Sequence, residues 1–401
     1  MTVTLADLEI ATFAVDEVVE GTQTGWSDGR LTLALPQLAV GAGSQPALAE
    51  ATVEVVRPGD RVRISNVLDV VLPSVRRDAT RVHRLDGVAV LSVCDWVGGG
   101  YAGAEELPDS LVDMGGPTWD RSPWGATPNV VVSCRPAAGA EIVEVDRAVR
   151  QVTAAVSAAI AEATVGSEPD EVRTIGPLPP ADPALPSVAL ILQVASEGPL
   201  LETFLDGVPL GTFDPRVLDD HVLFGGRLTN GAYDWPGVRN VTASYQEPAL
   251  ARELRALHGT TLRFAGVVLA PGYLDGADQK RRAADAAAEL VVGLGAHGVV
   301  CTTFSSGNSH TDTMLTLQAC ERRGIRTVAL VGETNGGLTD HVPEADCLIS
   351  TGNEDELVEP WTPERVIGPA DRARVGARVP AVHYLGGLGQ TGDARWTAVP
   401  A

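Results

Sequence analysis

The sequence predicts an α/β protein built of two α/β halves, of which the C-terminal one is a doubly wound, mostly parallel sheet. In the second half, continuous apolar runs alternate with amphipathic segments, the order typical of such sheets. In the first half, short β-like pieces separated by turn residues precede one long alanine-rich segment. A proline-rich stretch at 177–186 separates the two patterns and is the expected linker. We therefore expect an N-terminal domain over residues 1–176 and a C-terminal domain over residues 187–401.

The elements of the N-terminal half follow from their periodicity. Alanine-rich, apolar residues at helical spacing predict a helix over 142–164. The irregular stretch at 98–128 is long for a compact domain, and loops of that length are often functional. Strands are expected at 51–56, 61–64, 88–93 and 130–132.

The C-terminal half predicts buried parallel strands joined by right-handed crossovers. Ligands of such sheets lie beyond the carboxyl ends of the strands. Amphipathic helices are expected at 276–294 and 309–323. The strands are expected at 188–192, 265–269, 298–301 and 327–331.

Composition restricts the partners. The chain has 401 residues, 44% of them hydrophobic and 20% charged, which is typical of a globular protein. Its net charge of −22 argues against nucleic acid and anionic membranes as partners. No run of about 20 apolar residues is present to span a bilayer. The first residues lack the basic and apolar regions of a signal peptide, so we expect a cytoplasmic protein.

Cysteine and lysine usage argue against several cofactors. The five cysteines are scattered and never spaced as CxxC, so neither a disulfide framework nor a metal site is expected. Lys280 is the only lysine, and it opens a charged helical run that we expect to be solvated. A pyridoxal phosphate site or a nucleotide-binding P-loop would depend on this one lysine. We therefore expect neither pyridoxal phosphate nor a P-loop nucleotide as a bound cofactor.

Polar residues follow the expected strands near positions 308–333. Ser309 is placed to cap the next helix, with Asp312 in its first turn, and this structural interpretation is sufficient by itself. In the competing interpretation, Asn308 and Asp312 bind a substrate carboxylate at the helix N-terminus, while His310 acts as a general acid or base. Glu333, at the end of the next strand, is a second catalytic candidate.

A loop at 224–234, rich in glycine and small polar residues, lies in the middle of the chain. Together with the segments 55–64, 113–117 and 307–312, it resembles component B of the glycine, sarcosine and betaine reductases and the related D-proline reductase proprotein. The resemblance extends from about residue 5 to 368.

In that family the proprotein is cut before a cysteine, which becomes a pyruvoyl group whose ketone condenses with a substrate amine. The matching position here is Leu228, and no cysteine lies between Cys134 and Cys301, so a pyruvoyl group made from cysteine is excluded. Thr229 offers a different route, because its hydroxyl could attack the Leu228 carbonyl and elimination would leave a 2-oxobutanoyl group. Alternatively, residues 229–231 form an ordinary turn, which Asn-Gly favours.

The resemblance implies an oligomeric subunit of a reductase-like complex that cleaves a C–N or related bond of a small amino acid-like substrate. A partner subunit bearing cysteine or selenocysteine would be required. Thr229 is then a catalytic candidate, and Gly226 and Asn230 are substrate-binding candidates. The alternative is a non-catalytic structural or substrate-binding subunit that has lost the carbonyl. A polar pocket that converges on residues 226–231 favours the first hypothesis, and a buried apolar loop favours the second.

Overall fold

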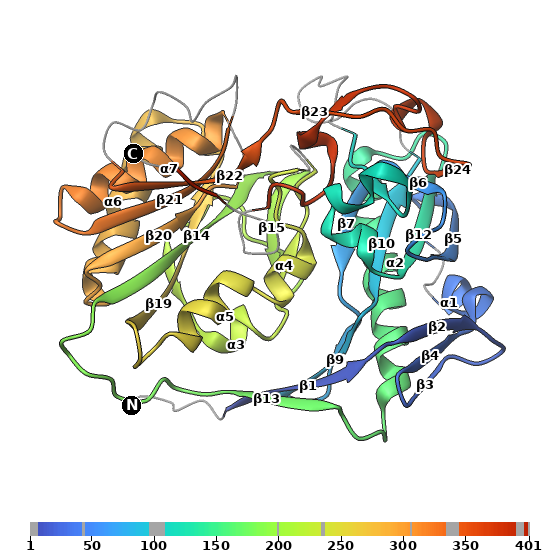
Figure 1. Ribbon diagram of the computed structural model, residues 1–401, viewed down its shortest axis with the longest axis horizontal. Coiled ribbons are helices and arrows are strands. Elements are labelled where there is room, and N and C mark those ends of the chain that lie inside the picture. Colours follow the sequence, from blue (N-terminus) through green and yellow to red (C-terminus); the bar gives the residue numbers. More distant parts are fainter. Residues whose placement is uncertain are drawn as a thin grey trace.

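A computed structural model describes residues 7–41, 45–95, 109–198, 200–233, 237–304, 307–333, 345–389 and 397–399. These residues form a mixed α/β protein with several sheets (Figure 1). The largest sheet lies in the C-terminal half and is mostly parallel, as the sequence predicts. No helix of the described residues is both long and apolar enough to cross a bilayer.

The core of the large sheet is five neighbouring parallel strands. Their order is β19 (Arg263–Gly272), β14 (Ser187–Gly198), β20 (Gly298–Thr302), β21 (Arg326–Glu333) and β22 (Cys347–Asn353). These strands coincide with the predicted apolar runs, because a strand covered on both faces needs apolar side chains on both. Antiparallel strands flank them, β17 (Arg216–Leu218) beside β19 and β26 (Thr397–Val399) beside β22.

Helices cover both faces of this sheet. On one face α6 (Ala277–Gly293) and α7 (Asn308–Glu321) pack through small and apolar side chains such as Ala287 and Leu317. These two helices agree with the predicted ranges to within two residues. On the other face lie α3 (Asp220–Leu223) and α5 (Ala249–Ala256), together with strand residues of the N-terminal half.

The N-terminal half consists mainly of small sheets packed against one long helix. That helix, α2 (Ile142–Ala161), continues as a 3-10 turn to Thr164, so the helix predicted over 142–164 is confirmed. The first sheet has the order β13 (Glu171–Ile175), β1 (Leu8–Ala14), β9 (Arg81–Asp86) and β8 (Ser74–Arg76). The second has the order β5 (Leu48–Val56), β12 (Asn129–Pro136), β10 (Ala89–Cys94) and β7 (Val67–Val71).

The remaining elements are short. A third N-terminal sheet has the order β2 (Glu17–Glu20), β4 (Arg30–Leu33) and β3 (Gly25–Ser27), followed by α1 (Leu35–Gly41). In the C-terminal half, β15 (Leu201–Leu205) pairs with β16 (Val208–Pro209) and β18 (Leu228–Asn230), near α4 (Thr242–Gln246). β23 (Leu357–Val358) pairs with β25 (Val379–Pro380), and further 3-10 helices cover Gly116–Arg121, Pro123–Ala126, Ala370–Arg372 and Ala381–His383.

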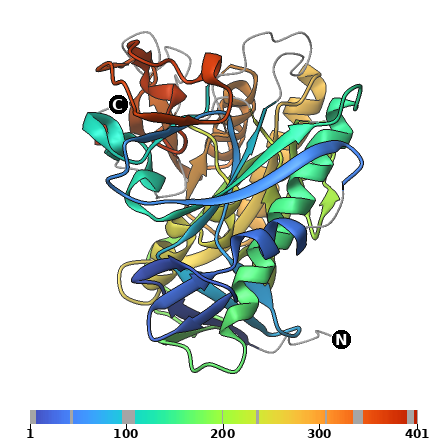
Figure 2. The same cartoon turned by 90° about the vertical axis from the view of Figure 1, so that its right-hand side faces the viewer.

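A segment near the end of the chain returns to the N-terminal half. There β24 (Arg365–Ile367) pairs in parallel with β6 (Val62–Ile64), whose other neighbour is β11 (Val112–Asp113). Figure 1 shows this segment in red beside the blue strands, and Figure 2 shows the same region from the side. The expected linker carries no helix or strand, and the domain limits at 176 and 187 stay a prediction. Residues 365–367 nevertheless complete a sheet that begins near residue 62.

A buried ion pair holds this junction together. Arg63 of β6 and Asp113 of β11 are 1% and 0% exposed, and Nε and Nη2 of the arginine donate to the two carboxylate oxygens at 2.6 and 2.7 Å. Arg63 also donates to the Ala373 carbonyl at 2.8 Å. Burial opposes the charge of Arg63, but the hydrogen bonds and charge of Asp113 outweigh it and raise the pKa of the guanidinium.

Candidate functional site

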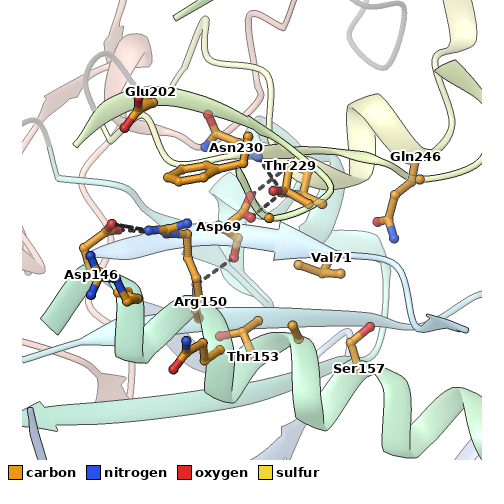
Figure 3. A pocket seen from close by; sticks show the side chains of 18 of the residues that line it. Asp69, Val71, Asp146, Arg150, Thr153, Ser157, Glu202, Thr229, Asn230 and Gln246 are labelled. Carbon is orange, nitrogen blue, oxygen red and sulfur yellow. Dashed lines mark hydrogen bonds and ion pairs between the residues drawn. The ribbon is translucent and has the colours of Figure 1, made fainter. Parts of the chain in front are cut away.

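A cavity of about 550 Å³ lies between α2 and the small ladder of β15 and β18 (Figure 3). Three predicted site residues, Gly226, Thr229 and Asn230, line it together. In Figure 3, Thr153 and Ser157 of α2 lie on the opposite side of the cavity from Thr229. Its other lining residues are Asp69, Val71, Ser74, Ser92, Val143, Asp146, Arg147, Arg150, Gln151, Ala154, Glu202, Phe204, Gly207, Pro209, Thr242 and Gln246.

The loop that resembles a processing site contains a short strand. A turn ends at Gly226, whose φ of 67° suits glycine, and β18 follows. Thr229 is opposite Phe204 in the antiparallel ladder with β15, and Leu228 is fully buried. The expectation of a turn at 229–231 is therefore wrong, because burial of Leu228 and pairing with β15 override the local preference of Asn-Gly.

Asn230 maintains the shape of the loop. Its Nδ2 donates to the Ala232 carbonyl, and the Ala232 N–H donates back to its Oδ1, both at 3.0 Å. Its own backbone N–H donates to Thr242 Oγ1 at 2.8 Å. The side-chain amide is thus bonded within the loop and buried, and the substrate-binding role of Asn230 stays a prediction.

Gly231 is required by close packing. A Cβ at this position would lie 2.5 Å from Cε2 of Phe204, well inside van der Waals contact. We expect Gly231→Ala to lower the free energy of unfolding by about 1–3 kcal/mol, because the ring must move. Urea denaturation measures the change. Gly293→Ala is the matched control, since its Cβ meets nothing within 4 Å and the residue is helical. Equal effects of the two substitutions would contradict the packing argument.

Arg150 of α2 spans the cavity wall from Asp146 to Phe204. Its Nη2 lies 2.7 Å from Asp146 Oδ2, and its guanidinium carbon lies 3.7 Å from the centre of the Phe204 ring. Burial disfavours its charge, but Asp146 outweighs burial and raises the pKa of Arg150. The buried Tyr233 hydroxyl donates to Asp146 as well. Asp146 is thus compensated within the protein.

Asp69 of β7 is a carboxyl group only 5% exposed at the cavity wall. Its Oδ1 accepts from the backbone N–H groups of Val70 and Thr242, each at 2.9 Å, and the Thr242 hydroxyl donates to its Oδ2. Burial raises the pKa of Asp69 to about 6, against the opposing effect of the Thr242 hydrogen bonds and the charge of Arg239. A carboxyl group with this pKa can exchange a proton near neutrality.

Glu202 of β15 is the third carboxyl group of the wall, 9% exposed. Its Oε1 accepts from the Gly211 N–H at 3.2 Å. Burial raises the pKa of Glu202, while that hydrogen bond and the charge of Arg150 lower it. Within the described part of the chain, neither Glu202 nor Asp69 forms an ion pair. The two groups can therefore hold an ammonium ion or move a proton.

Asp312 lies away from this cavity and is engaged inside the protein. It is paired with Lys280 at 2.8 Å, and its other oxygen accepts from the Leu274 N–H at 3.2 Å. Both side chains of the pair are buried. The expectation of a solvated Lys280 is wrong, because its pairing with Asp312 holds it in the interior. The pair joins α7 to α6, and the substrate-binding role of Asp312 stays a prediction.

The other candidates at the carboxyl end of the sheet are also outside the cavity lining. Helix α7 begins at Asn308 after Gly307, with no side-chain cap, so the cap expected from Ser309 is wrong. Asn308 is exposed, and its Nδ2 contacts the Leu274 carbonyl at 3.5 Å. Glu333 accepts a hydrogen bond from the Ser350 hydroxyl. The catalytic roles of His310 and Glu333 and the binding role of Asn308 stay predictions.

Sequence reasoning missed the charged residues of the cavity. Asp69 had a detectable signal, because a single carboxylate interrupts the apolar run 67–71. Burial of a carboxylate costs free energy, so one inside a buried strand indicates a partner or a functional role. Glu202 had none, since its neighbours come from distant segments. Arg150 has a local signal, because it follows Asp146 by four residues on the predicted helix, but that spacing does not reveal a cavity. In the residues that the structure describes, no cluster of three or more histidine, cysteine or acidic side chains is placed to hold a metal.

A family model described as "Glycine/sarcosine/betaine reductase component B subunits" matches residues 6–377. The chain belongs to this component B family. The sarcosine reductase complex component B subunit alpha of Peptoclostridium acidaminophilum is 28% identical over 91% of this chain and 90% of its own length. The glycine reductase complex component B subunits alpha and beta of Acetoanaerobium sticklandii are 25% identical over 90% and 88%.

A third relative of this component B chain is the betaine reductase complex component B subunit alpha of Peptoclostridium acidaminophilum. It is 27% identical over 88% of this chain and 85% of its own length. All three relatives are named as components of reductase complexes. No solved structure matches the chain. The family resemblance read from the sequence is confirmed.

Proposed function

We propose that this chain is the substrate-binding and catalytic subunit of a reductase-like complex. The complex would cleave a C–N or related bond of an amino acid-like substrate, together with a partner subunit bearing cysteine or selenocysteine. The observation that carries the proposal is the polar cavity that converges on Gly226 and Thr229. The alternative of a buried, apolar loop would have left no room for a substrate there.

Two of the three carboxyl groups that line the cavity suit the proposed reaction. Glu202 offers a charge to bind a substrate amine, and Asp69 offers a proton near neutral pH. In the proposed step the partner's thiolate or selenolate forms a bond to the α-carbon as the C–N bond breaks. The electron pair of that bond leaves on nitrogen, which takes a proton and departs as the amine. The carbon fragment stays on the partner as a thioether or selenoether.

Thr229 is the residue that could supply a carbonyl. It is half-buried and lines the cavity, so a 2-oxobutanoyl group at this position would face the substrate space. Such a ketone would activate a substrate amine by condensing with it. The regular ladder over Leu228–Asn230 supports an alternative in which the chain stays intact. The intact chain would then bind the substrate without reacting with it. Alternatively, it would hold a substrate whose leaving group the partner's thiol displaces directly.

The mass of the denatured chain, before and after treatment with a hydrazine, tests the carbonyl. We expect two fragments, one ending at Leu228 and one beginning at Thr229, the second carrying the hydrazine. Thr229→Val should abolish cleavage, and Thr212→Val, at an exposed position outside the cavity lining, should not. A single uncleaved chain whose mass is unchanged by the hydrazine would rule out the carbonyl mechanism.

Turnover tests the function itself. The complex isolated on a tagged chain, with dithiothreitol as reductant, is expected to release an amine from glycine, sarcosine, betaine or a larger amine. The complex isolated on a Glu202→Gln chain should release it much more slowly. Absence of amine release from every substrate would favour the non-catalytic subunit.

A further inference from the structure

We infer that this cavity takes an amine considerably larger than glycine, sarcosine or betaine. The ammonium group would pair with the Glu202 carboxylate, and an uncharged body would lie along Val71, Phe204 and Pro209. The inference rests on the proposed function, because it names the substrate class of the same site. It is supported independently by the volume, the charge and the apolar lining of the cavity.

The volume exceeds what the smallest amino acids need. A cavity of about 550 Å³ falls within the range of roughly 300–1,000 Å³ that holds drug-sized ligands. Glycine is the smallest amino acid, and betaine adds only three methyl groups to it. Either molecule would leave most of the cavity to water and its apolar walls uncovered. A longer substrate would cover those walls and gain the free energy of their burial.

The charges inside the cavity favour a cation. Asp146 is already compensated by Arg150, so its charge is not available to a ligand. Asp69 and Glu202 remain, each more than nine-tenths buried and, among the described residues, outside every ion pair. The charges of Arg239 and Arg150 lower the pKa of Asp69 and Glu202 respectively, but burial outweighs them and raises both pKa values. Arg147 is exposed, so water screens its charge. A bound ammonium group would compensate carboxylates that burial otherwise penalises.

The walls away from these carboxyl groups are partly apolar. Val71 of β7, Phe204 of β15 and Pro209 of β16 line the cavity, and Ala154 and Val143 of α2 add small apolar surface. These apolar side chains offer no ionic partner, and the Arg150 guanidinium that lies against the Phe204 ring is already paired with Asp146. The part of the ligand next to them is therefore uncharged, which distinguishes it from a compact zwitterion.

Three ligands of equal length test the inference by titration calorimetry on the purified full-length chain: phenylbutylamine, phenylbutanol and phenylbutyrate. We expect the amine to bind at least tenfold more tightly than the neutral alcohol, the acid or glycine. Betaine should bind as weakly as glycine. Equal or tighter binding of glycine, betaine or phenylbutyrate would overturn the inference.

Variants separate charge from size. Glu202→Gln should weaken the amine at least tenfold and leave phenylbutanol unchanged, whereas Glu50→Gln, at an exposed ion pair, should change neither. Ala154→Trp, on the exposed face of α2, should block the phenyl compounds without unfolding the chain. If Glu202→Gln and Ala154→Trp both bind phenylbutylamine as tightly as the unmodified chain, the assigned site is wrong. These experiments measure ligand binding alone. Their outcomes are therefore distinguishable from a failure of chain cleavage before Thr229 or of substrate turnover.

Discussion

Asp113→Ala is expected to lower the free energy of unfolding by about 3–5 kcal/mol, the usual cost of leaving one partner of a buried ion pair uncompensated. Arg63 would keep its charge in a site where only 1% of its surface reaches water. It would lose two hydrogen bonds to the carboxylate and retain those to the Ala373 carbonyl and the Tyr384 hydroxyl. Urea denaturation with an unchanged slope gives the difference directly.

Two controls define the cause of that loss. Glu364→Gln removes the partner of Arg61 in an exposed ion pair and should change stability by no more than about 0.5 kcal/mol. The double variant Arg63→Met with Asp113→Leu removes both charges and should recover much of the stability, because no charge is left buried. If the double variant is as unstable as Asp113→Ala, lost packing rather than the buried charge is the cause.

Asp69→Asn is expected to stabilise the protein at neutral pH by roughly 3 kcal/mol, which corresponds to a pKa raised from 3.8 to about 6. The folded state holds this proton more tightly than the unfolded chain. The contribution of the protonated group is therefore complete below pH 3.8 and is lost as pH rises towards 6. Asparagine stays neutral and keeps an oxygen to accept from Val70 and Thr242.

The measurement is the difference in unfolding free energy between Asp69→Asn and the unmodified chain, from pH 4 to 8. We expect it to grow with pH up to about 6 and to level off above. Asp275→Asn, at an exposed position, is the control and should change the free energy of unfolding by no more than about 0.5 kcal/mol. A constant difference for Asp69→Asn would mean that Asp69 is charged throughout. If Asp69→Asn is more stable than the unmodified chain but binds amines poorly, Asp69 serves ligand binding and lowers the stability of the folded protein.

The sequence predicts much of this fold because burial determines residue type along each element. Strands buried on both faces are unbroken apolar runs, as in β14 and β21, and helices beside them repeat small residues, as in α6. The long helix α2 was predictable for the same reason. Each of these signals lies within one contiguous segment.

The rest depends on contacts between distant segments. Local preference predicts a turn at Asn230, yet pairing with β15 makes a strand. Charge predicts an exposed Lys280, yet Asp312 on the next helix draws it into the interior. The cavity combines β7, α2, β15 and β18, so its volume and the meeting of Asp69 with Glu202 in one lining are set by tertiary packing. The sequence of any one segment carries little trace of that packing.

The pairing of β6 with β24 has a consequence for how the chain is made. Arg63 and its carbonyl acceptor at Ala373 are 310 residues apart, and synthesis proceeds from the N-terminus. A nascent chain that has not yet reached β24 carries an open strand edge at β6 and an arginine that lacks one of its acceptors. Such edges promote association with other chains. The N-terminal half therefore reaches its final structure only after residue 373 has left the ribosome.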